Sequence, residues 1–516
     1  MWIRTVTSEW TEGYLADVPY TDTVYQELFP SFLAFMCLLI GVRPPDLARG
    51  FRYCELGCGR GATLLHAAAT HPHGDFVGID FDPAAIASAR DLAREAGLAN
   101  VALHEEAFRD LAFRLSVSPG GVPDHERFDI VVLHGVYGWV AAENRQALVE
   151  ILRHWVRPGG LVFISYNCRA GWAPLVPLQR LLVRHAAQSS RRGNTRIEEA
   201  LAFLGQLRGG GASFFSTNPI AAHHLNDLER HHRGYLAHEY FNEYWDVFDH
   251  ADIASAVASA RLTFIGSATI PYNSDDLCLP APLREIVACV SDPALAEMVR
   301  DLTTGRVFRR DIFMRGPQRL SSEICLELLR KYRFTLRRPI NEIRLVFPVP
   351  LGELRGDPAI GGPILAALTE GTPRFVDLET DPKLAGTSPA AILRCLSLLV
   401  SSGQADIVSD HSEAAKEPCR RLNQETILRV LRGEDRSFAA APLIGGALRF
   451  SPLEHRILAA LYKGHPPDVS ILLSLLQEQL PLLKGGSECD GSSALTSTLE
   501  TVVAHHIPLW QRLGIV

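Results

Sequence analysis

The segment Glu55-Leu56-Gly57-Cys58-Gly59-Arg60-Gly61 carries the clearest ligand-binding pattern in the chain. Glycines at alternate positions let the backbone turn sharply and let a ligand lie against bare main chain. A dinucleotide site prefers the spacing GxGxxG and places pyrophosphate at the helix N-terminus. Here the spacing is GxGxG, and the acid that precedes it repels pyrophosphate but accepts hydrogen bonds from an ammonium, directly or through water. The loop therefore predicts a ligand with an ammonium group and no phosphate.

A second acid, Asp80, lies 19 residues after Gly61, at the end of the next predicted strand. An acid in this place can hold the two hydroxyl groups of a ribose. The neighbouring Phe81 can pack against the face of a purine. An adenosine joined to an amino acid through a sulfonium satisfies all of these groups, so the pattern favours S-adenosylmethionine.

Short apolar strands alternate with helices around these residues. Near-continuous apolar strands separated by helices predict a parallel sheet covered on both faces, which is an α/β doubly wound, Rossmann-like domain. The predicted strands are 51–55, 76–80, 101–104, 128–134 and 160–166, and the predicted helices are 63–70, 83–96 and 143–155. A helix at 251–261 and a strand at 262–267 are predicted to return to the same sheet after a helical insertion.

The motifs ELGCGRG and VGIDFD, in this order, resemble the class I S-adenosylmethionine-dependent methyltransferases. Further segments, at 19–28, 134–140, 165–172 and 235–242, are similar to bacterial methyltransferases with a methyltransferase regulatory domain, a group that includes rickettsial protein lysine methyltransferases. The resemblance covers roughly residues 15 to 275. It implies an enzyme that transfers a methyl group from S-adenosylmethionine.

The resemblance also implies roles for single residues. The acid and glycines of the loop would contact the methionine moiety, Asp80 the ribose and Phe81 the adenine, while His134 and Gly135 would flank the sulfonium. The acid that often contacts the adenine amino group aligns here with Ala107, and the adjacent Glu106 would face the other way in a regular strand. The full set of expected cofactor-binding residues is Tyr20, Tyr25, Glu55, Gly57, Cys58, Gly59, Gly61, Asp80, Phe81, Glu106, Ala107, Phe108, His134 and Gly135.

Methyl transfer from a sulfonium is an in-line displacement that needs positioning and no metal. A lysine acceptor must also lose a proton, which a partly dry aromatic pocket favours by lowering the pKa of the amine. The expected catalytic residues are Tyr137, Trp139, Tyr166, Asn167 and His134, and further aromatic walls are expected from Tyr20, Tyr25 and Trp172. Each aromatic residue is also a candidate for core packing. The pair His238-Glu239 resembles a catalytic dyad or a set of metal ligands, although a structural role is the more common one.

The domain pattern predicts four parts. Residues 1–45 are expected to form a helical cap over the cofactor site, and 46–275 the methyltransferase domain, with the insertion at about 175–245 and a regulatory-domain-like segment at about 214–275. A helical linker or middle domain is expected at 276–350, and a helical, winged-helix-like C-terminal domain at 351–516. The C-terminal half is expected to serve substrate recognition or dimerisation, the latter giving a homodimer.

The chain has 516 residues, of which 47% are hydrophobic and 21% charged, with a formal net charge of −7. This charge disfavours nucleic acid as a partner. Residues 32–40, the longest early apolar run, are too short to cross a bilayer. Ten cysteines without a CxxC pair and the lack of a signal peptide predict a cytoplasmic protein with reduced thiols. A stretch from Arg300 to Arg344 holds twelve Lys or Arg against five Asp or Glu, and predicts either a solvated face or a surface that docks an acidic protein substrate.

Three functions remain open on the sequence alone. The leading interpretation is methylation of a protein side chain, with lysine as the acceptor that the resemblance favours. The alternatives are methylation of a small molecule or peptide in a biosynthetic pathway, and a regulatory protein that binds S-adenosylmethionine without turnover.

Overall fold

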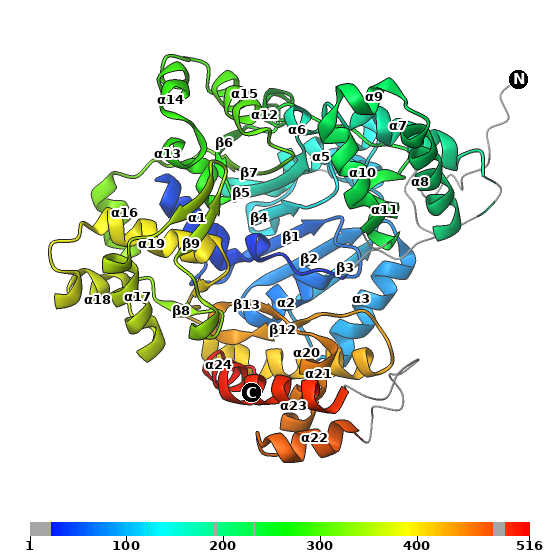
Figure 1. Cartoon of the computed structure of the whole chain (residues 1–516). Helices are drawn as coiled ribbons and strands as arrows, with labels where there is room; N and C mark the ends of the chain where they lie inside the picture. Colours follow the sequence, from blue (N-terminus) through cyan, green and yellow to red (C-terminus); the bar gives the residue numbers. More distant parts are fainter. Residues whose placement is uncertain (1–21, 119, 190, 192, 231–232, 478–490) are drawn as a thin grey trace, which may run out of the picture.

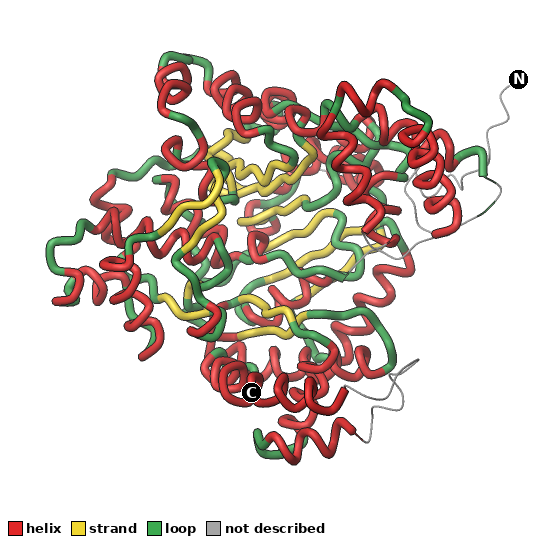
Figure 2. Tube along the Cα trace, in the orientation of Figure 1, coloured by secondary structure: helices red, strands yellow, loops and turns green. Residues whose placement is uncertain are grey.

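The computed structural model describes residues 22–118, 120–189, 191, 193–230, 233–477 and 491–516. Its centre is a seven-stranded sheet with the strand order β3-β2-β1-β4-β5-β7-β6 (Figures 1 and 2). Strands β1 to β5 run parallel, and β7 is antiparallel to both of its neighbours. The strands are β1 (Arg52–Leu56), β2 (Asp75–Asp80), β3 (Val101–Glu105), β4 (Phe128–Leu133), β5 (Val156–Asn167), β6 (Leu262–Ser267) and β7 (Phe308–Arg315).

Helices cover both faces of the sheet, and two clusters of buried apolar side chains lie between the layers. The helices that follow the parallel strands are α2 (Ala62–Thr70), α3 (Pro83–Glu95), α4 (Phe108–Ser116) and α5 (Ala142–Trp155). The side chain of Asp82 caps α3 by accepting hydrogen bonds from the amides of Ala84 and Ala85. The predicted doubly wound, Rossmann-like fold is therefore confirmed.

The sheet extends further along the chain than the expected boundary at residue 275. Strand β7 enters between β5 and β6, so that residues 308–315 belong to the same sheet. The charged residues Arg309, Arg310 and Asp311 hide this strand from an apolar pattern. Arg309 and Asp311 are nevertheless fully buried, because each finds its partners inside the protein.

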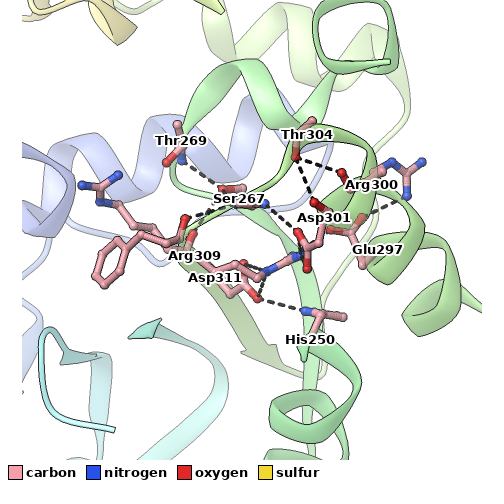
Figure 3. Close-up of polar contacts among 12 residues, drawn as sticks. His250, Ser267, Thr269, Glu297, Arg300, Asp301, Thr304, Arg309 and Asp311 are labelled. Atoms are coloured by element: carbon pink, nitrogen blue, oxygen red, sulfur yellow. Dashed lines mark hydrogen bonds and ion pairs between the residues drawn. The ribbon is translucent and has the colours of Figure 1, made fainter. Parts of the chain in front are cut away.

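Arg309 lies at the centre of a buried charge network (Figure 3). Its guanidinium contacts Asp311 at 2.9 Å, Asp301 at 2.7 Å and Glu297 at 2.7 Å. Asp311 also lies 2.9 Å from Nδ1 of His250. Burial opposes ionisation of Asp311, but Arg309 and the hydrogen bond with His250 hold the pKa of its carboxyl below the usual value. The network fastens the helices α12 (His250–Ala258) and α15 (Pro293–Thr304) to the sheet.

A helical insertion separates β5 from α12. Its helices are α6 (Arg169–Trp172), α7 (Val176–Ala186), α8 (Asn194–Gly209), α9 (Ser213–Thr217), α10 (Pro219–Arg230) and α11 (Arg233–Tyr240). They enclose an apolar cluster of their own, in which Trp172, Tyr240 and Val247 are buried. Figure 1 shows these helices grouped on one side of the molecule.

The C-terminal half is mostly helical, as predicted. It holds three two-stranded sheets, which pair β8 (Phe334–Leu336) with β11 (Ala405–Ile407), β9 (Val346–Val349) with β10 (Gly352–Arg355), and β12 (Phe438–Ala441) with β13 (Gly446–Arg449). The remaining helices are α1 (Pro30–Ile40), α13 (Asp275–Cys278), α14 (Ala281–Ala288), α16 (Ser322–Leu329), α17 (Pro358–Glu370), α18 (Phe375–Glu379), α19 (Pro389–Ser401), α20 (Ser412–Leu431), α21 (Pro452–Tyr462), α22 (Val469–Gln477), α23 (Gly491–Thr501) and α24 (Ile507–Arg512).

Helix α20 packs against α2 and α3, so the C-terminal half lies against the helices next to the glycine loop (Figure 1). The winged-helix arrangement of this half stays a prediction. Within the described part of the chain, no helix combines the length and the apolar character needed to cross a membrane.

Candidate active site

The glycine loop turns between β1 and α2 in a backbone conformation that favours glycine. Gly57, Gly59 and Gly61 have φ angles of +77°, +51° and +70°. A side chain at Gly57 would also lie 2.4 Å from Cγ2 of Val136, so this position needs glycine for space as well. Around Gly59, by contrast, a Cβ atom would meet nothing within 4 Å. The loop is thus tight toward the β4 side and open at its centre.

Asp80 ends β2 beside this loop. Its Oδ2 accepts a hydrogen bond from the amide of Gly59 at 2.7 Å, and its Oδ1 accepts one from the amide of Asp82 at 3.0 Å. Burial raises the pKa of the Asp80 carboxyl, while these amides act against the shift. The structure therefore brings Asp80 and the half-buried Phe81 to the loop, as the sequence predicts.

Glu55 is the other acid at the loop. It is 7% exposed, and its Oε2 has no hydrogen-bond partner among the described residues. Burial, and then the nearby Asp80, raise the pKa of the Glu55 carboxyl to about 8. A buried acceptor oxygen without a partner is costly, and a ligand that brings an ammonium or another donor to this oxygen would remove that cost.

The segment 106–108, which is expected to contact the adenine, follows the end of β3. The carboxylate of Glu106 forms two hydrogen bonds with Arg114 on α4, at 2.9 and 2.8 Å, so both oxygens are already engaged. The amide of Glu106 donates to the carbonyl of Asp80 at 2.9 Å, which holds the 106–108 backbone next to the end of β2. Ala107 is the N-cap residue that precedes α4, and Phe108, the first residue of α4, is buried. The structure thus commits the Glu106 side chain to Arg114, and the expectation of an adenine contact here rests on the backbone of this segment.

His134 follows β4 and is held on two sides. Its Nδ1 lies 3.0 Å from Oγ of Ser165, and the same hydroxyl accepts a hydrogen bond from the amide of Gly135 at 3.0 Å. The Tyr25 ring lies 3.9 Å from the His134 ring, centroid to centroid. Burial, and then Arg310, lower the pKa of His134 to about 3. His134 is therefore neutral at ordinary pH and a poor proton acceptor. Ser165 is not among the residues expected at the site, because a serine within an apolar strand carries no functional signal of its own.

The N-terminal segment that carries Tyr25 is fastened from both halves of the chain. The amide of Tyr25 donates a hydrogen bond to Oγ1 of Thr63 on α2, at 3.3 Å. Asp22 forms an ion pair of 2.8 Å with Arg436, and the side chains of both are about 95% buried. Nothing in the sequence pattern indicates this pair, because its members come from opposite ends of the chain. Tyr20, also predicted to contact the cofactor, lies outside the described residues.

The carboxyl end of β5 adjoins the helical insertion. Asn167, the last residue of β5, donates from Nδ2 to Oε1 of Glu239 on α11, at 3.4 Å. Its carbonyl accepts a hydrogen bond from the amide of Phe248 at 2.9 Å, and the Phe248 ring packs on Tyr137 at 5.4 Å. Trp139 is 7% exposed, and its indole Nε1 has no partner among the described residues. Tyr137, Trp139 and Asn167 are thus brought to the edge of the sheet at the carboxyl ends of β4 and β5.

Tyr166 is placed differently from the prediction. Side chains alternate along a strand, and Tyr166 therefore lies on the opposite face of β5 from Ser165 and Asn167. It is fully buried, and its hydroxyl donates to Oδ2 of Asp311 at 2.6 Å. The structure thus makes Tyr166 part of the buried charge network and does not bring it to His134.

Comparisons with known proteins agree with this geometry. The family described as "Methyltransferase domain" matches residues 47–206, and the family described as "Predicted methyltransferase regulatory domain" matches residues 232–315. The Synechocystis protein sll1526 is 33% identical over 512 residues, which cover 98% of this chain and 99% of that protein. This chain belongs to the class I S-adenosylmethionine-dependent methyltransferases with a regulatory domain.

Two rickettsial proteins are also similar to this methyltransferase. RP028 of Rickettsia prowazekii is 26% identical over 230 residues, 44% of this chain and 86% of that protein. The structure of PKMT2 from Rickettsia typhi in complex with AdoHcy superposes with a TM-score of 0.69 at 20% identity, over 96% of this chain and 99% of that chain. The fold is therefore shared along nearly the whole length, including the C-terminal half.

The donor side of the methyltransferase fits S-adenosylmethionine. The unpartnered Oε2 of Glu55 offers an acceptor for the donor's ammonium, and the open centre of the glycine loop leaves room against the main chain. The donor itself supplies the electrophilic methyl group.

The arginine-rich stretch from 300 to 344 gives the methyltransferase less free positive charge than its composition suggests. Most of its cations lie within ion-pair distance of an acid in the same chain, because the fold uses them to join elements. The pairs are Arg300–Asp275, Arg306–Asp301, Arg309–Asp301, Arg310–Glu27, Arg330–Glu379, Arg333–Asp410 and Arg337–Asp406. The interpretation as a docking surface for an acidic protein loses its main support.

Proposed function

We propose that this enzyme transfers a methyl group from S-adenosylmethionine to a lysine side chain of a protein. The observation that carries the proposal is the composition of the edge at the carboxyl ends of β4 and β5. It holds the aromatic residues Tyr137, Trp139 and Phe248, together with the carboxyl of Glu239 and the amide of Asn167. A cationic acceptor with an aliphatic stem fits such an edge, because ring faces attract an ammonium and its methylated forms.

In this proposal Glu55, Gly57, Gly59 and Gly61 bind the methionine moiety of the donor, and Asp80 and Phe81 bind its nucleoside. Tyr25 and His134 enclose the sulfonium side, and Ser165 keeps the His134 ring in place through their 3.0 Å contact. Because the reaction is an in-line displacement, the main task of these residues is to align the acceptor nitrogen with the methyl group.

The resemblance to rickettsial protein lysine methyltransferases supports lysine as the acceptor. We also propose that the C-terminal half recognises the protein substrate or pairs with a second copy of the chain. The C-terminal half contacts α2 and α3 through α20. The carboxyl end of β5 is instead contacted by the helical insertion. Light scattering on the purified chain distinguishes a dimer from a monomer.

The test of the proposed function is incubation of the purified enzyme with labelled S-adenosylmethionine and a cell lysate, followed by gel separation and tryptic mass analysis. Lysine methylation predicts label on a protein band and a methyl increment on a lysine-containing peptide. Label in the small-molecule fraction alone would support the biosynthetic alternative. Retention of the donor without any methylated product would support a regulatory protein.

A further inference from the structure

Glu239 is fixed at the edge where the acceptor is expected. It belongs to α11 in the helical insertion, and its carboxyl meets Asn167 at the end of β5, 3.4 Å away. Its main-chain carbonyl accepts a hydrogen bond from the Trp245 indole at 2.9 Å. Asn167 comes two residues after Ser165 on the same face of β5, and Ser165 contacts His134. The carboxyl therefore lies on the edge that also carries the donor-side histidine.

The segment that follows Glu239 runs along the same edge and holds it in place. The amide of Asp246 donates to the carbonyl of Gly138 at 2.9 Å, and the amide of Phe248 donates to the carbonyl of Asn167 at 2.9 Å. These backbone contacts tie the insertion to the ends of both β4 and β5. The position of Glu239 relative to the sheet is thus set by the fold and not by a free loop.

The Glu239 carboxyl has no cationic partner among the residues that the structure describes, although it is only partly exposed. The nearby arginines are engaged elsewhere, since Arg145 pairs with Asp246 at 2.9 Å and Arg169 pairs with Asp249 at 2.8 Å. Removing a carboxylate from water without a cation is unfavourable. An incoming ammonium would remove this penalty.

Aromatic rings pack behind the main chain of Glu239, in the apolar cluster of the insertion. The Trp172 ring lies 5.0 Å from that of Trp245 and 5.6 Å from that of Tyr240. Trp245 is also the residue whose indole bonds to the main chain of Glu239. These rings keep water away from the insertion side of the helix that carries Glu239.

Other groups on this edge are poorly suited to take a proton. Nδ1 of His134 is held by Ser165, and the pKa of this histidine is lowered to about 3 by burial and Arg310. Burial raises the pKa of the Tyr137 phenol. Burial also raises the pKa of Glu239 to about 7, and the hydrogen bond from Asn167 acts against this shift. Two histidines belong to the same insertion: His238 precedes Glu239 on α11, and His224 on α10 bonds to the Tyr240 hydroxyl.

We propose that Glu239 binds the ammonium of the acceptor lysine and takes one of its protons, and that Asn167 is the positioning residue that orients this carboxyl. The inference rests on the proposed function and names the group that prepares the acceptor. The Glu239 carboxylate accepts a proton from the ammonium, which leaves a neutral amine and a carboxylic acid. The amine lone pair then forms the N–C bond as the S–C bond breaks and its electrons stay on sulfur. Glu239 returns its proton to water after the methylated ammonium leaves.

The test compares Glu239→Gln with the matched variant Glu243→Gln, which removes the same charge from an exposed position four residues later. Initial rates of lysine methylation in lysate proteins are measured by tryptic mass analysis at saturating S-adenosylmethionine, from pH 6 to pH 9. AdoHcy affinity by calorimetry and thermal melting serve as controls for folding. We expect Glu239→Gln to lower the rate by about 100-fold or more and to lose the rise in rate through pH 7, with unchanged AdoHcy affinity. Glu243→Gln should behave as wild type.

Asn167→Ala provides a second readout that does not depend on loss of the carboxyl. Removal of a hydrogen bond that lowers the pKa of Glu239 should move the midpoint of the pH–rate profile to higher pH. If Glu239→Gln does not fold, this shift and the rate of Glu239→Asp decide the question. A wild-type rate and pH profile in Glu239→Gln would overturn the inference while lysine methylation stands. If the wild-type enzyme methylates no lysine, the proposed function fails and the inference fails with it.

Discussion

The amide of Gly59 donates a hydrogen bond to Oδ2 of Asp80, with 2.7 Å between the two atoms. This bond joins the middle of the glycine loop to the end of the neighbouring strand β2. The residue expected to hold the ribose thus also sets the shape of the loop expected to hold the methionine moiety. The two halves of the donor site are therefore coupled.

Asp80→Ala should weaken AdoHcy binding by about 10- to 100-fold, since it removes a charged hydrogen-bond acceptor worth about 1.5–3 kcal/mol. Isothermal titration calorimetry on the purified chain measures this change. Asp91→Ala removes an acid that is 50% exposed on α3 and should leave the affinity unchanged. Equal AdoHcy affinity in wild type and Asp80→Ala would contradict the assignment of this residue to the donor site.

Gly57→Ala should lower the free energy of unfolding by about 2–4 kcal/mol. The new methyl group would clash with Val136, and alanine disfavours the left-handed backbone conformation at this position. Gly120→Ala is the matched control, since Gly120 has a φ of +82° and open space around its Cβ position. The control should lose only about 1–2 kcal/mol. Urea denaturation of both variants isolates the steric part of the effect. Equal losses would show that the Val136 contact relaxes freely.

Glu55 should release a proton when the donor binds. Because its pKa is about 8, the free carboxyl is mostly protonated at pH 7, and the donor's ammonium favours the ionised form. Calorimetry at pH 7 in two buffers with different ionisation enthalpies measures the released proton. Affinity should rise between pH 6 and pH 7.5 in the wild type. Glu55→Gln should lose both effects, and proton release that persists in this variant would assign it to another group.

The same raised pKa of Glu55 predicts how the free energy of unfolding changes with pH. The folded state keeps the Glu55 proton up to a higher pH than the unfolded chain does, so the contribution of Glu55 to the free energy of unfolding falls between about pH 4.5 and pH 8. Without ligand, Glu55→Gln should therefore gain stability relative to wild type as the pH rises through this range. A denaturant series at pH 5 and pH 8 measures the difference.

Arg309→Met should lower the free energy of unfolding by about 3–5 kcal/mol, because it leaves Asp301 and Asp311 buried without their central cation. Arg355→Met, at an exposed position of β10, should have little effect. Guanidinium denaturation followed by circular dichroism compares the two. A small loss in Arg309→Met would show that the carboxylates of the network are protonated rather than paired.

The meeting of the glycine loop and Asp80 could be predicted from the sequence because its signals are local. The glycine spacing, the acid before it and the acid that ends the next strand all lie within 26 residues, from Glu55 to Asp80. A strand, a turn and a helix that follow one another constrain such residues to one place in any doubly wound sheet.

The remaining features depend on contacts between distant segments. Ser165 meets His134 across neighbouring strands, Asn167 meets Glu239 from 72 residues away, and Asp22 meets Arg436 from the other end of the chain. Strand alternation sends Tyr166 into the core, although its sequence neighbours reach the site. A charged residue such as Arg309 is expected at the surface from its residue type alone. The tertiary structure can bury it because distant segments supply carboxylates of opposite charge. The sequence alone determined the fold class, the cofactor and the position of the glycine loop beside Asp80. Tertiary packing decided the surroundings of the β4 and β5 ends and the extent of the sheet, since no local pattern encodes which distant side chains will meet.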